Sequence, residues 1–447
     1  MADLPSVGFF DIVSNTRSIL RNPLVFHEKK FRELGDTFTV KSPGGQAFIL
    51  TRDAGLALHV LQKNHRNYEK SVLQTVDLAR YIGHGLLTTN GDHWLTHRRM
   101  IQPGFSKKKL SGLFEMMYQA IKDEVSRVDE DQMVDVFPLM SDLAFQVVAK
   151  SLFSNDNIRK RMTRLQVITL AAQEMLIKEM RQPYLRWWFR LNGSIDKHLL
   201  MGDEARDIIK GLIEERVENT AEKDDLLDML LAARYEDGDA MPMKQIIGEV
   251  LILFTAGHET TANALSFTLF HIAKDADLQR KVFDEVNAFD FESRDLMEAY
   301  TQLPVTKYCL EEAMRLFPPA YIMDRVAIGD DSYEDIGIQK GSMILMSLYE
   351  IQRDQRFWTK GDQYDPMRWD KTNADSSITK KESVGRYFPF GAGPRMCVGN
   401  HFAMFEMIVT IAHIVKNYRL ETNVEQIDIV PLISLKPKEV PVKFVSR

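Results

Sequence analysis

The sequence predicts a mainly α fold with a long central helix and a small β-rich portion. From about Ala54 to Lys274, apolar residues recur mostly at helical spacing, with polar or glycine-containing breaks such as Asn90-Gly91. The last helical segment of this region opens at Pro242 and has no internal proline. At 1.5 Å per residue it would be about 50 Å long, so it has to cross the middle of a large domain. Further helices are expected up to Leu316, because Pro318-Pro319 ends the pattern.

Four stretches have the composition and alternation of β-strands: Thr37–Val40, Ala47–Thr51, Ile336–Leu348 and Ile427–Val445. The first two flank a predicted turn at Ser42-Pro43-Gly44-Gly45. The third has Lys340-Gly341 at its centre and is expected to form a hairpin. These stretches are short beside the helical region, so β structure is predicted to be the minor part of the fold.

The composition is that of an ordinary globular protein. The chain has 447 residues, of which 45% are hydrophobic and 27% charged. It shows no linker, repeat or low-complexity run, so we expect a single domain over residues 1–447. The net charge of −6 gives no reason to expect nucleic acid as a partner.

Cysteine content and hydropathy indicate where the protein works. Two cysteines in the chain argue against a disulfide framework and for a reducing compartment, so we expect a cytoplasmic protein. The N-terminus has no basic region followed by an apolar core, and we expect no signal peptide. The longest apolar window, Val250 to Ala256, runs into His258 and Glu259, so no membrane span is expected.

The most informative segment is the glycine- and proline-rich stretch from Phe388 to Gly399, which contains Cys397. A helical pattern from Asn400 to roughly Lys416 follows at once, which would place the thiol at the positive end of a helix dipole. That position lowers the pKa of a thiol and suits a metal ligand. The alternative is a small buried hydrophobic residue, which is the interpretation we favour for Cys309 in its helical pattern.

This segment resembles the haem-ligand loop of the cytochrome P-450 superfamily, Phe-x-x-Gly-x-Arg-x-Cys-x-Gly. The residues in register are Phe390, Gly393, Arg395, Cys397 and Gly399. The resemblance extends from about Asp36 to Lys436 and implies the cytochrome P-450 fold, in a soluble member of bacterial type. It implies that Cys397 is the axial ligand of the iron of haem b (iron protoporphyrin IX), and that the loop, with Gly391, holds the cofactor.

A second motif lies in the middle of the long helix, at Ala256-Gly257-His258-Glu259-Thr260-Thr261. Glycine in a helix interior costs about 1 kcal/mol, and small residues let another body approach the backbone. The segment resembles the oxygen-binding kink of the family. The resemblance implies that Ala256 and Gly257 lie against the cofactor and that Glu259 and Thr260 deliver protons to bound oxygen. The alternative is a helix packing site with a solvated glutamate, and His258 is given no role.

Two further groups of charged residues support the resemblance. Glu312 and Arg315 are spaced i, i+3 and can pair on one helix face. With Arg368, from Pro366-Met367-Arg368-Trp369, they match the structural triad that fixes the cysteine loop in the family. The resemblance also implies a set of ligands for the haem propionates: Trp94, Arg98, Arg325 and Arg395. The alternative for Arg325 alone is a surface arginine.

The implied function is that of a haem-thiolate monooxygenase, which inserts one atom of O2 into a substrate C–H bond by hydroxylation or oxidative O-demethylation. Electrons are expected from separate chains, a ferredoxin and its reductase, with NAD(P)H as the indirect source, and the protein is expected to be a monomer. Lys107-Lys108-Lys109 either docks the carrier or is a solvated charge run. The alternatives are a peroxide-driven haem peroxygenase and a haem-binding sensor without catalysis.

The substrate is left open between a fatty-acid-like molecule and a polar oxygenated one such as a methylated sugar. The resemblance implies a pocket lined by five regions: Ser71–Thr89, Leu176–Gly193, the long helix, the segment after Pro319 and Leu432-Ile433-Ser434. The aromatic candidates are Tyr184, Trp187, Trp188 and Phe189. The polar candidates are Asp77, Arg80, His84, Arg186, Arg190 and Asp324. Snorkelling of these charges to solvent is the alternative.

Overall fold

The computed structural model describes residues 4–41, 47–154, 158–219, 223–292, 296–372 and 385–447. The predicted turn at Ser42-Pro43-Gly44-Gly45 lies outside these residues. The chain forms two compact units, each assembled from separate stretches. The first unit contains Met1–Ser71, Glu311–Cys397 and Ile429–Lys436, and the second contains Val72–Leu310, Val398–Asp428 and Pro437–Arg447.

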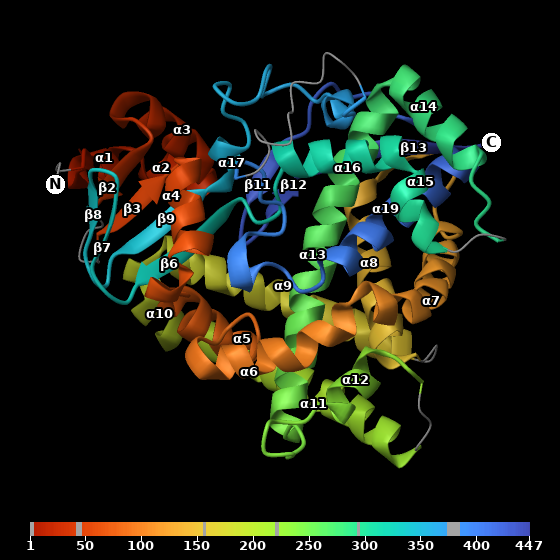
Figure 1. The fold of residues 1–447 in the computed structure, drawn as a ribbon, viewed down its shortest axis with the longest axis horizontal. Coiled ribbons are helices and arrows are strands. Elements are labelled where there is room, and N and C mark those ends of the chain that lie inside the picture. Colours follow the sequence, from red (N-terminus) through yellow and green to blue (C-terminus); the bar gives the residue numbers. More distant parts are fainter. Residues whose placement is uncertain (1–3, 42–46, 155–157, 220–222, 293–295, 373–384) are drawn as a thin grey trace. The chain divides into compact units, whose positions relative to one another are not determined.

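The first unit holds most of the β structure (Figure 1). Its helices are α1 (Phe9–Ser14), α2 (Thr16–Arg21), α3 (Pro23–Leu34), α4 (Ala54–Leu58) and α17 (Leu348–Ile351), with short helical turns η1 (His59–Lys63), η2 (His65–Asn67), η8 (Pro366–Trp369) and η9 (Gly393–Arg395). Its strands are β1 (Ser6–Val7), β2 (Thr37–Val40), β3 (Phe48–Thr51), β4 (Tyr68–Glu69), β6 (Ile322–Ala327), β7 (Asp331–Tyr333), β8 (Ile336–Ile338), β9 (Met343–Ser347), β11 (Ile429–Pro431) and β12 (Leu435–Pro437).

The main sheet of the first unit has the strand order β1-β2-β3-β9-β6-β4. β3 pairs antiparallel with β2 and parallel with β9, with Phe48 opposite Met343. Alternate residues such as Phe38 and Ile344 are buried, as expected for strands with one face on a core. The predicted strands at 37–40 and 47–51 are therefore confirmed, the second starting one residue later.

The predicted hairpin over Ile336–Leu348 is wrong in its pairing. β8 pairs with β7, whereas β9 pairs with β3 and β6. The Lys340-Gly341 turn exists, and Gly341 has a φ of 83°. The turn redirects the chain from the small β7–β8 ribbon into the main sheet, because the amide of Gly341 donates to the carbonyl of Ala327 on β6 at 2.8 Å.

The second unit is mainly helical (Figure 1). Its α-helices are α5 (Ala79–Ile82), α6 (Gly91–Ile101), α7 (Lys107–Val125), α8 (Val136–Phe153), α9 (Arg159–Arg181), α10 (Arg186–Leu191), α11 (Ser194–Glu218), α12 (Leu226–Ala232), α13 (Met243–Lys274), α14 (Ala276–Asn287), α15 (Ala299–Gln302) and α19 (Asn400–Asn417). Helix α16 (Pro304–Leu316) begins in this unit and ends in the first. The remaining elements are η3 (Leu73–Leu78), η4 (Gln102–Phe105), η6 (Pro183–Leu185), η7 (Leu296–Glu298) and strands β5 (Met133–Asp135), β10 (Tyr418–Glu421) and β13 (Pro441–Ser446).

The long helix is confirmed as α13, which begins after Pro242 and runs unbroken through 32 residues. Most of its residues are buried on all sides, which is typical of a helix through the centre of a helical unit. It packs against α8, where the ring centres of Phe145 and Phe254 are 5.1 Å apart. The helix that follows, α14, begins at Asp275, whose carboxylate accepts from the amides of Asp277 and Leu278.

Helix α8 alone among the described helices is long and apolar enough to span a membrane by length and composition. In the structure, 72% of that window is buried inside the protein. Core helices pass the same test, so its hydropathy is explained by packing against α13.

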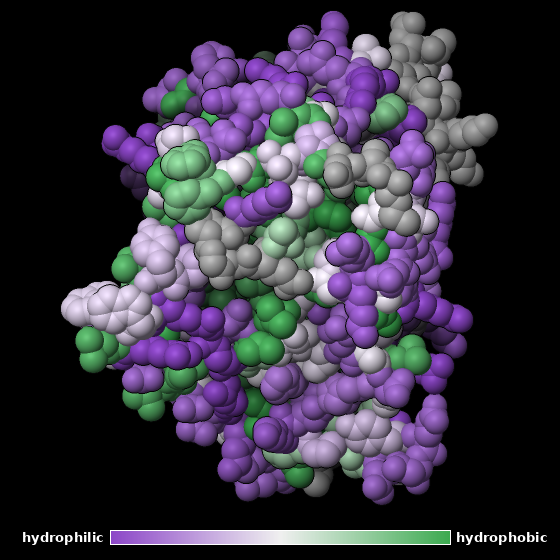
Figure 2. All heavy atoms as spheres, turned by 90° about the vertical axis from the view of Figure 1, so that its left-hand side faces the viewer, coloured by the Kyte–Doolittle hydropathy of each residue, from purple (hydrophilic) through white to green (hydrophobic). Residues whose placement is uncertain are grey.

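Two groups of exposed large apolar side chains lie close together along the chain. In the first unit they are Phe9, Phe10 and Val13 of α1. In the second unit they cluster at η6 and α10, with Tyr184, Trp187, Trp188 and Leu191 between 46% and 73% exposed. Figure 2 shows one face of the molecule, on which apolar patches alternate with larger polar areas.

Candidate functional site

The cysteine loop of the first unit is held by its own backbone. The amide of Cys397 donates to the carbonyl of Phe390 at 2.9 Å, and the amide of Met396 donates to the carbonyl of Gly393 at 3.1 Å. Gly391 and Gly393 have φ values of 74° and 69°, in the region that disfavours a side chain. The loop therefore presents Cys397 exposed at its end rather than buried as a core thiol.

Gly393 also allows a close backbone contact. A Cβ atom at this position would lie 2.0 Å from the carbonyl oxygen of Leu61 in η1. No side chain fits that gap, so the glycine sets how closely the cysteine loop approaches η1.

Two arginines lie close together beside this loop. Arg325 on β6 is only 4% exposed and donates to the carbonyl of Asp324 at 2.6 Å. Burial lowers the pKa of Arg325 to about 10, the carboxylate of Asp324 raises it, and the nearby charge of Arg395 lowers it further. Burial also lowers the pKa of Arg395, whose guanidinium donates to the carbonyl of His65 at 3.3 Å. Two neighbouring cations, one buried and one half-buried, favour an anionic ligand at this point.

The structure brings Glu312, Arg315 and Arg368 together in the first unit. Arg315 donates to both carboxylate oxygens of Glu312, at 2.9 and 2.8 Å, and Arg368 donates at 2.9 Å. Trp369 adds an indole N–H at 3.0 Å. Glu312 and Arg315 are fully buried, so these charges are compensated by one another and by backbone groups.

Gln352 connects this cluster to the cysteine loop, and no sequence motif marked it. Its side-chain amide donates to the carbonyls of Met314 and Arg315, both at 3.0 Å. Its side-chain oxygen accepts from the amide of Phe388, the first residue of the loop segment, at 2.8 Å. The triad therefore reaches the loop through one fully buried glutamine.

The predicted proton-delivery motif lies on α13 in the second unit. Ala256 is exposed although the residues around it on the helix are mostly buried. The hydroxyl of Thr260 donates to the carbonyl of Ala256 at 2.9 Å, and the side chain of Glu259 is buried. Ala256 and Thr260 thus form a narrow accessible strip on an otherwise packed helix.

Gly257 packs against α8, as the helix-packing alternative in the sequence analysis expected. A Cβ atom there would lie 3.2 Å from a methyl group of Val148 on α8. His258, to which the sequence gave no role, is fully buried and its Nδ1 lies 2.7 Å from the carbonyl of Phe254. Burial lowers the pKa of His258, so it is a neutral core histidine.

The remaining predicted cofactor ligands also belong to the second unit. Trp94 on α6 is buried, and Arg98 one turn later is half-buried and donates from Nε to Gln102 at 2.9 Å. Gly399 precedes the first residue of α19, where a Cβ atom would lie 3.8 Å from the ring of Phe105. The helix predicted from Asn400 to about Lys416 is confirmed as α19.

Three of the six polar candidates for the pocket, Asp77, Arg80 and Arg186, form ion pairs. Arg80 and Arg186 both reach Glu179, at 3.1 and 3.0 Å, and both reach Asp77, at 3.2 and 2.5 Å. Glu179 is buried and also accepts from the hydroxyl of Tyr81. The sequence analysis missed Glu179, because nothing along the chain shows that α9 lies beside η3 and α5. The two arginines and the two acidic residues therefore neutralise one another.

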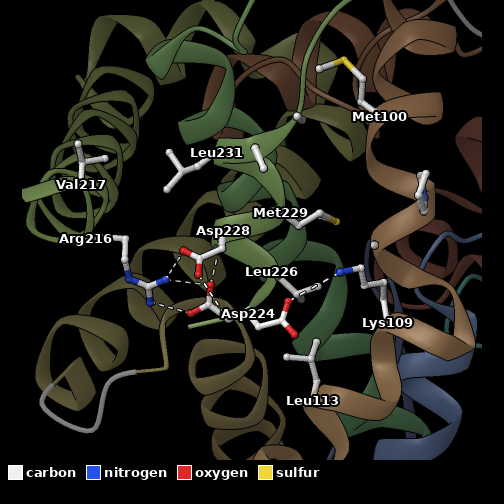
Figure 3. A pocket seen from close by; sticks show the side chains of 15 residues that line it. Met100, Lys109, Leu113, Arg216, Val217, Asp224, Leu226, Asp228, Met229 and Leu231 are labelled. Carbon is white, nitrogen blue, oxygen red and sulfur yellow. Dashed lines mark hydrogen bonds and ion pairs between the residues drawn. The ribbon is translucent and has the colours of Figure 1, made fainter. Parts of the chain in front are cut away.

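A cavity of about 690 Å³ lies in the second unit between η4, α7, the end of α11 and α12 (Figure 3). Arg216 at its edge pairs with Asp225 and Asp228 at 2.6 and 2.7 Å. Met229 and Leu226 contribute apolar surface. None of the residues predicted to bind cofactor lines it.

The chain belongs to the cytochrome P-450 family, whose profile matches residues 9–444. Members of this family are haem-thiolate monooxygenases, so the protein is an oxidoreductase of that class. The resemblance stated from the motifs and the predicted fold class are thereby confirmed.

Similar proteins occur in bacteria, plants and mammals. Protein LUTEIN DEFICIENT 5, chloroplastic, of Arabidopsis thaliana is 24% identical over 400 residues, which are 85% of this chain and 66% of that protein. The ultra-long-chain fatty acid omega-hydroxylase of Homo sapiens is 28% identical over 372 residues, 77% of this chain and 69% of the relative. Echinocystic acid 23-monooxygenase of Saponaria officinalis is 26% identical over 395 residues, 83% of this chain and 73% of the relative.

The residues of the first unit fit the haem that the family implies. An exposed thiol on a rigid loop provides the iron ligand. The adjacent arginines, Arg325 and Arg395, carry the positive charge that two propionates need. On α13 of the second unit, the accessible Ala256 offers the small side chain that a flat ring system requires next to a helix.

Proposed function

We propose that this protein is a haem-dependent monooxygenase that hydroxylates an aliphatic, fatty-acid-like substrate with electrons from a separate carrier. The single observation that carries the proposal is the cysteine loop, which presents an exposed Cys397 beside two partly desolvated arginines. We further propose that residues 1–447 act as one cytochrome P-450 domain in the cytoplasm, which one family match over 9–444 and two free cysteines support.

In this proposal Cys397 holds the iron of haem b, and Arg325, Arg395, Trp94 and Arg98 hold its propionates. Bound in this way, the thiolate-ligated iron supplies the chemistry that activates O2. The thiol lies just before the N-terminus of α19, whose dipole favours the deprotonated form. Phe390 and Gly391 provide the loop backbone that fixes the sulfur atom.

Glu259 and Thr260 handle protons in this proposal. In the structure, the Thr260 hydroxyl donates to the carbonyl of Ala256, which leaves its oxygen lone pairs free to accept. A proton arriving from the Glu259 carboxyl can be held at Thr260 Oγ1 and passed on as the hydroxyl proton moves. Glu259 itself is buried, whereas Thr260 lies on the accessible strip of the helix.

The electron carrier is proposed to be an acidic ferredoxin, reduced by its own NAD(P)H-dependent reductase. Lys107 and Lys307 lie 5.4 and 5.1 Å from the centre of the Tyr300 ring, and His401 of α19 packs on the same ring. Lys108 is also exposed, whereas the ammonium of Lys109 lies 3.8 Å from the carboxylate of Asp224. This positive surface adjoins the start of α19, the helix that follows Cys397, and opposite charge would steer an acidic partner there.

Pairing of the pocket charges favours the fatty-acid-like substrate over the polar one. Asp77, Arg80, Arg186 and Glu179 pair with one another, so these side chains are engaged within the protein and offer little to the hydroxyl groups of a sugar. A fatty-acid hydroxylase among the relatives supports the same choice. Oxidative O-demethylation of a methylated sugar remains the second outcome of the test.

The test is the absorption spectrum of the purified, dithionite-reduced protein under carbon monoxide. A strongly red-shifted Soret band supports thiolate ligation, and a band typical of a histidine ligand overturns the proposal. The same sample is then titrated with dodecanoic acid, hexadecanoic acid and an O-methylated hexose. A low- to high-spin shift with the fatty acids alone supports the substrate class. Turnover with peroxide but not with ferredoxin and NAD(P)H would indicate a peroxygenase, and no turnover would indicate a sensor.

A further inference from the structure

Glu249 on α13 is a buried carboxylate whose two oxygens serve two different elements. Its Oε1 lies 3.0 Å from Nδ1 of His97 on α6, and each of these side chains is 1% exposed. Its Oε2 accepts from the backbone amide of Leu86 at 3.0 Å. One carboxylate therefore links α6, α13 and the loop that contains Leu86.

The loop around Leu86 is fitted closely onto α13. A Cβ atom on Gly85 would lie 2.7 Å from Oε2 of Glu249, and one on Gly248 would lie 2.4 Å from the carbonyl oxygen of His84. Gln245 donates both to Oε1 of Glu249, at 3.1 Å, and to the carbonyl of His84, at 3.2 Å. Any displacement of this loop therefore changes its contacts with the Glu249 carboxylate.

Other titratable groups surround the pair and connect it to the surface. The ring of His93, an exposed residue, stacks on that of His97 at 4.3 Å. Burial lowers the pKa of His93, and the neighbouring His97 lowers it further. The hydroxyl of Tyr235 lies 3.3 Å from Nε2 of His97, and burial together with the charge of Glu249 raises the pKa of Tyr235.

The elements that meet at Glu249 carry the parts of the proposed active site. Helix α6 bears Trp94 and Arg98, which we assign to the propionates, and α13 bears Glu259 and Thr260. The loop belongs to Ser71–Thr89, the region expected to line the substrate pocket. Because the Glu249 carboxylate contacts both the loop and α6, we expect a displacement of the loop to be passed on to α6.

We propose that Glu249, through His97, is a positioning residue that couples the Gly83–Thr89 loop to the haem-binding helix α6. The inference rests on the proposed function, since α6 contacts haem only if the protein binds the cofactor in the way proposed above. Its consequence is that a change confined to the loop alters how tightly haem is retained, and a change on α6 alters how firmly the loop is held.

The experiment compares haem-loaded wild-type protein with Glu249→Gln, His97→Gln, the double variant and Gly85→Ala. The rate of haem transfer to excess apomyoglobin reports on α6, and hydrogen exchange of peptides over 83–89 reports on the loop. The control is Asp225→Asn, which breaks a buried ion pair between Arg216 of α11 and the residue that caps the start of α12, in the same unit. The melting temperature of each variant gives its general loss of stability.

We expect Glu249→Gln and His97→Gln each to lose haem at least about fivefold faster, and the double variant to be no worse, because the pair acts as one unit. His97→Gln should also raise exchange over 83–89, and Gly85→Ala should speed haem loss. Asp225→Asn should lower the melting temperature without either effect.

Haem loss that tracks the melting temperature in all variants, the control included, would show that the pair is only structural and overturn the coupling. Additive effects in the double variant would overturn it as well. A wild-type protein that takes up no haem, or shows no thiolate band under carbon monoxide, would instead overturn the proposed function itself.

Discussion

Arg315 donates to both carboxylate oxygens of Glu312, at 2.9 and 2.8 Å, and neither side chain is exposed to solvent. A bidentate pair in this setting is strong only while both partners are charged and Arg368 completes the cluster. Because Arg315 also donates to backbone carbonyls of Gln352 and Gly361, the cluster fixes several segments of the first unit at once.

Replacing Glu312 by Gln should therefore destabilise the protein by about 3 to 5 kcal/mol, since two buried guanidinium groups lose their countercharge. Urea unfolding at pH 7 measures the change. The neighbouring substitution Glu311→Gln, on the same helix and only half-buried, serves as the control and should cost less than about 1 kcal/mol. Equal losses in the two variants would contradict the role of the cluster.

Cys397→Ser should abolish the red-shifted carbon monoxide band while leaving the fold intact. The side chain is exposed, and the loop is held by backbone contacts that serine retains. Cys309→Ala is the matched control, because Cys309 is the other cysteine of the chain and is buried. It should keep the band, and loss of the band in both variants would remove Cys397 from its assigned role.

Thr260→Ala should lower the product formed per NAD(P)H consumed at least about tenfold, because the hydroxyl that holds the proton is removed. The measurement uses a substrate identified by the spin-shift titration, with ferredoxin and reductase supplied. The adjacent residue provides a control: Thr261 is buried on the packed side of α13, and Thr261→Ala should keep the coupling. A fully coupled Thr260→Ala would rule out the relay.

Glu350→Gln should stabilise the protein at alkaline pH. Burial raises the pKa of Glu350, and the positive charge of Arg52 partly offsets this effect. The resulting pKa is about 7. The folded state therefore holds this proton more tightly than the unfolded state, and stability falls as pH rises from about 4.5 to 7. At pH 8 the variant should be about 2 to 3 kcal/mol more stable than the wild type, with little difference at pH 4.5. Thermal unfolding at the two pH values measures this difference. An equal gain in stability at both would exclude titration of Glu350 as the cause.

Asp331→Asn should have the opposite effect to Glu350→Gln and should destabilise the protein at neutral pH. Burial alone would raise the pKa of Asp331, but hydrogen bonds from Tyr68, His59 and Asn64 outweigh it and hold the pKa at about 2. The contribution to stability is complete above about pH 4 and is lost as pH falls toward 2, so the variant should lose about 2 kcal/mol at pH 7 and converge with wild type in acid. Asp330→Asn, at an exposed neighbour, is the control and should change the stability at pH 7 by less than about 1 kcal/mol.

The sequence predicted those features that depend on local pattern. The long helix followed from an uninterrupted apolar periodicity after Pro242, and α19 from the stretch after Gly399. Strand pairing was harder, because β8 and β9 are equally compatible with a mutual hairpin until the position of β7 is known. Partners from distant segments were missed for the same reason, among them Glu179, Gln352 and the contact between His97 and Glu249.

The contact between Gly393 and the carbonyl of Leu61 has a bearing on protein engineering. Because this contact is between two stretches of backbone, it fixes the position of the cysteine loop relative to η1. Libraries that vary only side chains around the loop do not change that position. Tuning of the iron centre is then confined to electrostatics, for example at Arg325, and to the accessible strip of α13. A redesign that needs a different iron position would have to rebuild η1 together with the loop.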